Sequence, residues 1–111
     1  LGGHDKKLRF YSLFAARNLM DLTSLQKQII EREFKFQLHK EDVDIEAFDI
    51  KDHYFSILML FPFTKDVRSI LRAIISECNQ YGNFLDSNFL FTNVKIFSDV
   101  EIQQFLDKKA E

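Results

Sequence analysis

The segment that most restricts the fold is YFSILMLFPF, residues 54–63. It is an apolar run that ends at the only proline of the sequence. Its aromatic content and the proline near its end favour a β-strand over a helix. Apolar and polar residues do not alternate along it, which is typical of a strand inside a sheet rather than at its edge. The segment therefore predicts a central strand.

The elements around this strand are predicted from periodicity and end signals. Apolar residues recur at spacings of three and four over about 65–80, which predicts a helix that Thr64 can cap. Strands are expected at 43–50 and 89–97. In the former, Phe48 and Ile50 break the alternation, which indicates a bulge. A short helix is expected at 98–109, because Ser98 and Glu101 have capping-box spacing.

The first third of the chain allows two interpretations. A strand at 7–15 can lead into a helix at about 22–34, since Thr23 and Gln26 have capping-box spacing. Alternatively, a heptad-like series of apolar residues over 8–36 fits one long helix. The segment 34–38 also alternates, so the second strand can begin earlier than residue 43. The caps favour the strand followed by a helix.

The resulting order is β-α-β-β-α-β followed by a terminal helix, which is the order of the ferredoxin-like α+β plait. That fold has a four-stranded antiparallel sheet with both helices on one face and the first and third strands in the centre. A chain of 111 residues with 46% hydrophobic residues is long enough for one core. We expect a tail or cloning scar at 1–6 and a single domain at 7–111, which can be part of a longer chain.

The sequence carries no arrangement that points to catalysis, a cofactor or a metal. Cys78 falls on the apolar stripe of the predicted helix, and His39 and His53 share no metal-ligand spacing. The three glycines form no phosphate-binding loop. Six acids at 41–52 are predicted to form a solvated edge strand, although Asp42, Asp44 and Glu46 could also hold a cation or a basic partner. We therefore expect a non-enzymatic protein without cofactors.

The cellular setting is predicted from the same composition. No run of about 18 apolar residues is present, so no membrane insertion is expected. The single cysteine favours a reducing compartment such as the cytoplasm. Residues 1–40 carry a net charge of +4 and residues 41–111 a net charge of −6. Because proteins that bind phosphates usually have a basic excess, nucleic acid is not an expected partner.

The segment LFAARNL, residues 13–19, resembles the first-strand motif of RNA-recognition-motif domains. The resemblance covers seven residues, and the third strand lacks the Lys/Arg-Gly-aromatic pattern of that family. It implies a nucleic-acid platform of aromatic and basic side chains on the open face of the sheet. The residues expected there are Arg9, Tyr11, Tyr54, Phe91 and Lys95. Single-stranded nucleic-acid binding is the alternative function.

The main hypothesis concerns the apolar character of that same open face. If the bulkier residues of the third strand face the helices, the other face presents a contiguous apolar patch, which usually marks an interface. The expected interface residues are Leu13, Tyr54, Leu58, Leu60, Phe89 and Phe91. The sequence thus predicts a module for self-association, as a homodimer, or for binding another protein subunit. The terminal helix is a third possible cover for the patch.

Overall fold

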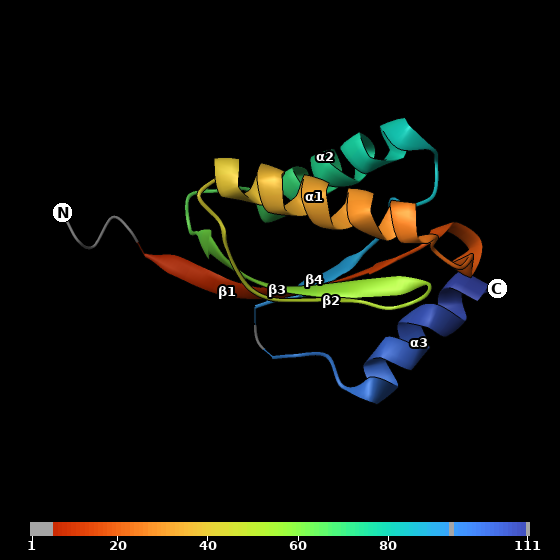
Figure 1. Ribbon diagram of the computed structural model, residues 1–111. Coiled ribbons are helices and arrows are strands. Elements are labelled where there is room, and N and C mark those ends of the chain that lie inside the picture. The colour runs from red at the N-terminus through yellow and green to blue at the C-terminus, as the bar shows by residue number, and fades with distance from the viewer. Residues whose placement is uncertain (1–5, 94, 111) are drawn as a thin grey trace.

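The protein is a small α+β domain with a four-stranded antiparallel sheet and three α-helices, in a computed structural model that describes residues 6–93 and 95–110. Helices α1 and α2 cover one face of the sheet, and α3 lies on the opposite face (Figure 1). The expected tail at 1–6 lies outside the described residues, apart from Lys6. The elements in chain order are β1 (Lys7–Ala15), η2 (Arg17–Leu19), α1 (Ser24–Lys40), β2 (Asp44–Ile50), β3 (Tyr54–Pro62), α2 (Val67–Cys78), η3 (Asn79–Tyr81), β4 (Leu90–Thr92) and α3 (Asp99–Ala110).

The strands lie in the order β2-β3-β1-β4, and each neighbouring pair is antiparallel. The first and third strands are therefore central, as the apolar run at 54–63 predicts. In the register of β1 with β3, Leu13 lies opposite Ser56 and Arg9 lies opposite Leu60. Because side chains alternate along a strand, these residues share one face of the sheet.

The main core lies between the sheet and helices α1 and α2. Phe55, Ile57, Met59 and Phe61 of β3 are all 0% exposed on this side, which confirms the predicted facing of that strand. Phenylalanine rings fill the centre: the ring of Phe14 lies 4.7 Å from that of Phe55 and 5.1 Å from that of Phe34. Edge and stacked ring pairs add to the apolar burial, so the unusual phenylalanine content is used mainly for packing.

The first third folds as a strand followed by a helix, and the interpretation as one long helix is wrong. Thr23 Oγ1 accepts a hydrogen bond from Gln26 N at 3.0 Å, and Gln26 Oε1 accepts one from Thr23 N at 2.9 Å. This capping box starts α1 where the sequence predicts it. The helix continues through 34–38, because Phe34 and Leu38 are buried one turn apart while Phe36 is exposed. The suggested early start of the second strand is therefore wrong.

Two other boundaries differ from the sequence predictions. Asp66 rather than Thr64 caps α2, because Ser69 N donates a hydrogen bond to Asp66 Oδ1 at 3.2 Å. In the range 89–97 the described residues form a strand only over Leu90–Thr92, since the chain then turns toward α3. The bulge in β2 lies between Ile45 and Ala47, slightly before the predicted break.

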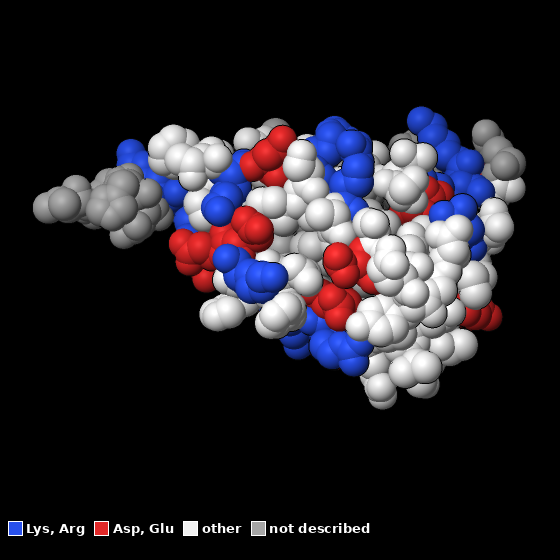
Figure 2. Space-filling model, turned by 90° about the horizontal axis from the view of Figure 1, so that it is seen from above, with Lys and Arg blue, Asp and Glu red and all other residues white. Residues whose placement is uncertain are grey.

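The charges on the helix side of the molecule are mixed. Figure 2 shows lysine and arginine side chains interspersed with aspartate and glutamate over α1 and α2, without one large patch of either sign. No helix among residues 6–93 and 95–110 is both long and apolar enough to cross a membrane.

Candidate nucleic-acid interface

One end of the sheet face opposite α1 and α2 is covered by α3. Phe105 and Leu106 of this helix pack against Leu13 and Ala15 of β1, and all four are at most 7% exposed. Tyr54 is half-buried against the same cluster. The terminal helix is therefore the cover over this part of the apolar patch.

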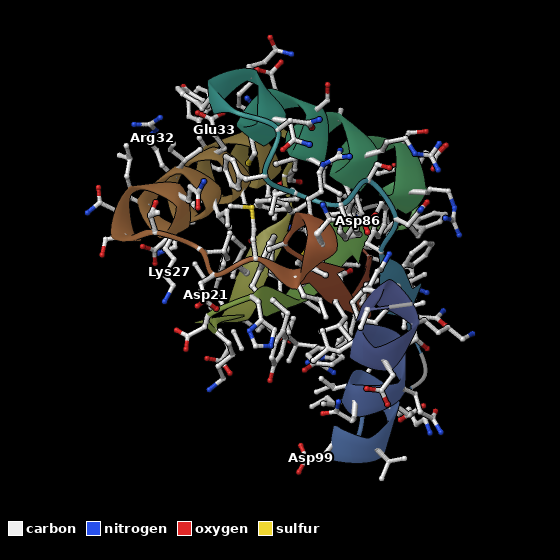
Figure 3. All side chains as sticks on the ribbon, turned by 90° about the vertical axis from the view of Figure 1, so that its right-hand side faces the viewer. Asp21, Lys27, Arg32, Glu33, Asp86 and Asp99 are labelled. Carbon is white, nitrogen blue, oxygen red and sulfur yellow. The ribbon has the colours of Figure 1, made fainter. Side chains whose placement is uncertain are left out.

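The C-terminal end of α3 is held in place by a lysine. Lys109 Nζ lies 3.1 Å from Asp86 Oδ2 and donates a hydrogen bond to the carbonyl oxygen of Asn88 at 3.2 Å. Both side chains of this ion pair are largely buried, with exposed fractions of 14% and 23%. Figure 3 shows Asp86 beside the sheet and Asp99 at the far, outer end of α3. The helix is thus fixed at one end by charge and along its length by apolar contact.

The other end of this face is crossed by ion pairs. Arg9 donates two hydrogen bonds to the carboxylate of Glu46, at 2.7 and 3.3 Å, and Lys7 Nζ lies 3.0 Å from Asp44 Oδ2. These ion pairs connect β1 to β2 across the central strand β3, where Leu60 lies opposite Arg9 on one side and Asp44 on the other. The Arg9 hydrogen bonds lower the pKa of Glu46, so this carboxyl remains charged at neutral pH. The acids of β2 are therefore neutralised by the protein's own cations.

Two predicted interface residues lie on the other side of the sheet. Phe91 is in register with Ser12, and its ring lies 5.8 Å from that of Phe10 in the helix-side core. The ring of Phe89 lies 5.3 Å from that of Phe14. The assignment of Phe89 and Phe91 to the open face is wrong, because pairing of the short β4 with β1 turns Leu90 to that face instead.

Between the part under α3 and the ion pairs lies a hollow of about 100 Å³. Its walls come from β1, β3 and the segment that leads from β4 to α3. The ring of Tyr11 in this hollow lies 5.2 Å from that of Phe97. The residues that line it are Arg9, Tyr11, Leu58, Thr92, Asn93, Lys95 and Ile96.

The hollow brings together part of the platform that the sequence predicts. Arg9, Tyr11 and Lys95 line it, whereas Tyr54 lies under α3 and Phe91 lies on the helix side. Thr92 and Ile96 were missed, because they belong to a segment that was expected to continue as a strand with these two side chains on its other face. The hollow combines an aromatic ring, two aliphatic side chains, an amide and two cations. Such a set suits an unpaired base and its phosphate.

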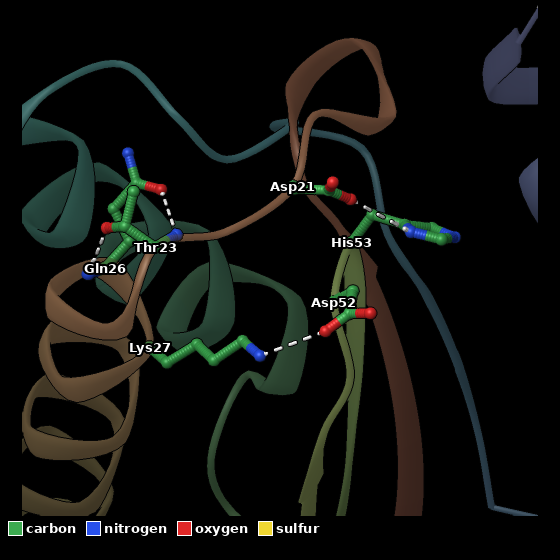
Figure 4. A network of polar contacts seen from close by, with 6 residues as sticks. All are labelled: Asp21, Thr23, Gln26, Lys27, Asp52 and His53. Atoms are coloured by element: carbon green, nitrogen blue, oxygen red, sulfur yellow. Dashed lines mark hydrogen bonds and ion pairs between the residues drawn. The ribbon is translucent and has the colours of Figure 1, made fainter.

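A polar cluster joins the β2–β3 turn to the start of α1. His53 Nδ1 lies 3.8 Å from Asp21 Oδ1, and Lys27 Nζ lies 3.2 Å from Asp52 Oδ1 (Figure 4). The backbone N–H of Leu22 also donates to the carbonyl oxygen of Asp52 at 2.7 Å. Within the described part of the chain, no three His, Cys, Asp or Glu residues are grouped so that they could hold a metal ion. Burial raises the pKa of Cys78 to about 12, which makes its thiol a poor nucleophile.

No protein-family model and no curated protein matches this chain. Several solved structures share its fold, among them the following two. A protein from Deinococcus radiodurans R1 assigned as a transposase matches with a TM-score of 0.82 at 11% identity, over 96% of this chain and 94% of that one. A REP-associated tyrosine transposase bound to a REP hairpin matches with a TM-score of 0.68 at 16% identity. That match covers 92% of this chain and 64% of the other.

These similarities contradict the functional predictions made from the sequence. Both neighbours are transposases, which are enzymes, so the prediction of a non-enzymatic interaction module is wrong. One of them is bound to a hairpin, which contradicts the prediction that nucleic acid is not a partner. The expected homodimer or protein-subunit partner is not confirmed. The nucleic-acid-binding alternative agrees better with the neighbours.

Proposed function

We propose that this protein is a DNA-binding domain related to transposases and that it recognises DNA with unpaired nucleotides, such as a hairpin. The observation that carries this proposal is the match over nearly the whole length of both chains to a protein assigned as a transposase. The second neighbour, bound to a hairpin, supports the choice of ligand. We also propose that the fold is a ferredoxin-like plait, supported by the order β2-β3-β1-β4, and that the domain works in the cytoplasm.

The hollow on the open sheet face is the proposed seat for an unpaired nucleotide. A base can stack on the ring of Tyr11, with Leu58 and Ile96 as apolar neighbours and the amide of Asn93 available for its polar edge. Arg9 and Lys95 stand at the same hollow and can contact the flanking phosphates. Arg9 pairs with Glu46 and Lys95 with Glu101, and because both cations are exposed, ion pairs of this kind are weak. A phosphate can therefore compete for them.

The test is a binding titration with labelled oligothymidine and with a short DNA hairpin. Tyr11→Ala should weaken binding of the single strand by about 5- to 150-fold, because stacking contributes roughly 1–3 kcal/mol per base. Tyr11→Phe should bind nearly as well as the wild type, since the ring is kept. Tyr81→Ala removes an exposed tyrosine near α1, hydrogen-bonded to Glu33, and is the matched control. No binding of either DNA by the wild-type protein would refute the proposed function.

Strand cleavage is the second candidate function, favoured because both neighbours are transposases and one is a tyrosine transposase. A tyrosine hydroxyl can attack a phosphodiester, forming a phosphotyrosyl bond and releasing the hydroxyl of the next sugar. Tyr11 lies in the hollow, and the ring of Tyr54 lies 5.8 Å from that of His53. Incubation with labelled hairpin DNA and a divalent cation should give a denaturation-resistant protein–DNA adduct. Its loss in Tyr11→Phe or in Tyr54→Phe would identify the nucleophile, and no adduct with any hairpin would exclude this activity.

A further inference from the structure

The exposed side of α2 carries two arginines that form no close ion pair with the described residues, although the charge of Arg68 contributes to lowering the pKa of Asp66. Arg68 and Arg72 are one helical turn apart, so they lie on the same side of the helix, about 6 Å apart along its axis. Both are exposed, and neither forms an ion pair with any of the described residues. Two like charges at this spacing weaken an isolated helix.

The position of Arg68 is set by an aromatic ring of the sheet. Its guanidinium carbon lies 4.9 Å from the ring centre of Phe91, which belongs to the edge strand β4. This contact holds a charged planar group at the margin of the sheet. Asp66, the nearest acid along the helix, is occupied by the hydrogen bonds from Ser69 that cap α2. The guanidinium groups thus remain available to an anion.

The arginine pair adjoins the hollow around the edge of the sheet. The ring of Phe91 contacts Arg68 on the helix side of the sheet. The next residue in the chain, Thr92, lines the hollow on the open side. Only the backbone of β4 separates the two surfaces, and β4 has no neighbour on its outer side among the described strands. A bound chain can therefore pass from the hollow over this edge to α2.

At the opposite edge of the sheet, formed by β2, the charged residues are mainly acidic and have cationic neighbours. Each acid of the cluster at 41–52 has a lysine or arginine within 3.5 Å, and Lys7 is shared by Asp42 and Asp44, so the negative charge of that edge is largely but not fully balanced. The acidic residues concerned are Glu41, Asp42, Asp44, Glu46, Asp49 and Asp52. Figure 2 shows lysine and arginine atoms at the upper margin of the helix side, with acidic atoms beside them. Arg68 and Arg72 add positive charge on the β4 side, where Arg68 contacts the ring of Phe91.

We propose that Arg68 and Arg72 bind the phosphate backbone of a duplex stem that continues from the unpaired nucleotide in the hollow. Arginine suits this role because its planar guanidinium donates two hydrogen bonds to one phosphate. The guanidinium of Arg68 lies over the ring of Phe91, so we expect these arginines to contact the backbone and not unstacked bases. The inference rests on the proposed function and assigns the stem to the α2 side of β4. The DNA therefore bends around the β4 edge.

The test compares a labelled DNA hairpin with oligothymidine, using Arg68→Ala/Arg72→Ala and a control with the same loss of charge. Lys35→Ala/Lys40→Ala is that control, because both lysines are exposed on α1. The arginine variant should bind the hairpin about tenfold more weakly and release about two fewer counterions in a salt titration. Its affinity for oligothymidine should stay within about twofold of the wild type. Thermal unfolding of both variants verifies that they are folded.

Each result either supports or overturns the inference. Equal losses in the arginine variant and the lysine control would show a general effect of charge and overturn it. Unchanged hairpin binding by the arginine variant would overturn it as well, while leaving the proposed function intact. If the wild-type protein binds the hairpin no better than oligothymidine, the stem makes no contact and the inference fails. If the wild type binds neither DNA, the proposed function and the inference fail together.

Discussion

On the open face of the sheet, an ion pair within the protein occupies one of the cations of the proposed DNA site. The carboxylate of Glu46 accepts two hydrogen bonds from Arg9, which lines the hollow. A DNA phosphate must compete with this carboxylate for the same guanidinium. Glu46 is therefore expected to limit the affinity for DNA, even though it lies on the edge strand and outside the hollow.

Glu46→Gln should tighten binding of oligothymidine about two- to fivefold, since an exposed ion pair contributes roughly 0.2–1 kcal/mol. The pKa of Glu46 is lowered by Arg9, so the wild-type carboxylate is charged over the whole neutral range. The gain should therefore be the same across that range and shrink only when the pH falls through the lowered pKa. Anisotropy titrations measure it. Asp49→Asn is the control, because Asp49 pairs with Lys51 and not with Arg9, and an equal gain there would indicate general charge.

Another residue-scale feature is a buried hydroxyl. Ser12 lies in the central strand β1 and is 0% exposed, and its Oγ has no hydrogen-bond partner among the described residues. Ser12→Ala should raise the free energy of unfolding by about 1 kcal/mol, because an unpaired buried hydroxyl is removed without leaving a large cavity. Urea unfolding measures this change. Ser87→Ala, at an exposed loop position, should have little effect, and a loss of stability in Ser12→Ala would contradict the expectation.

At the scale of elements, α3 both covers the sheet and frames the hollow. Phe105 is 7% exposed against Leu13 and Ala15, whereas Val100 on the same helix is 66% exposed. The segment that joins β4 to α3 supplies Lys95 and Ile96 to the hollow. Docking of this helix and binding of the unpaired nucleotide should therefore be coupled.

Phe105→Asp should release α3 from the sheet, because the apolar contact of the ring with Leu13 and Ala15 is lost and Lys109, which lies over the ring, already pairs with Asp86. We expect a lower melting temperature, increased binding of a hydrophobic dye and weaker oligothymidine binding than in the wild type. Val100→Asp introduces the same charge on the exposed side of α3 and should change none of these. If both variants behave alike, α3 does not cover the sheet in solution.

The start of α1 allows a similar comparison. Thr23 forms a capping box with Gln26, whereas Thr64, a capping residue predicted from sequence, does not cap α2. Thr23→Ala should lower the free energy of unfolding by about 1 kcal/mol, and Thr64→Ala should change it by less than about 0.5 kcal/mol. Chemical denaturation of both variants measures the difference. The reverse order would mean that the cap assignments are exchanged.

For nucleic-acid binding by the whole molecule, the distribution of charge over the surface matters more than the net charge. The chain has a formal net charge of −2, which on its own argues against nucleic-acid binding. Folding places cations beside the acids at 41–52, whereas Arg68 and Arg72 form no close ion pair with any described residue. An acidic protein can thus present a local cationic surface at one edge of its sheet.

Binding of a DNA hairpin should accordingly depend on salt to a limited extent. If Arg9, Lys95, Arg68 and Arg72 each contact one phosphate, the slope of log K against log salt concentration is about −4 at most. Titrations at several salt concentrations measure it. A slope near zero would exclude the phosphate contacts, and a much steeper one would require cations beyond these four.

The sequence alone determined the features that depend on near neighbours in the chain. The apolar run at 54–63 identified the central strand and its facing, and the capping-box spacings located the starts of α1 and α3. Such signals are local, because a strand alternates and a cap bonds within three residues. The element order and the antiparallel α+β sheet follow from these signals in sequence.

Only the tertiary structure decided which residues meet across the sheet. The register of β4 with β1 turned Phe91 to the helix side, and a strand of three residues carries too short a pattern to reveal its facing. The docking of α3, the hollow around Tyr11 and the meeting of Arg68 with Phe91 join segments far apart in the chain. Contacts of this kind depend on packing between distant segments, and no local sequence pattern specifies which segments meet. The proposed site could therefore be identified only in the folded structure.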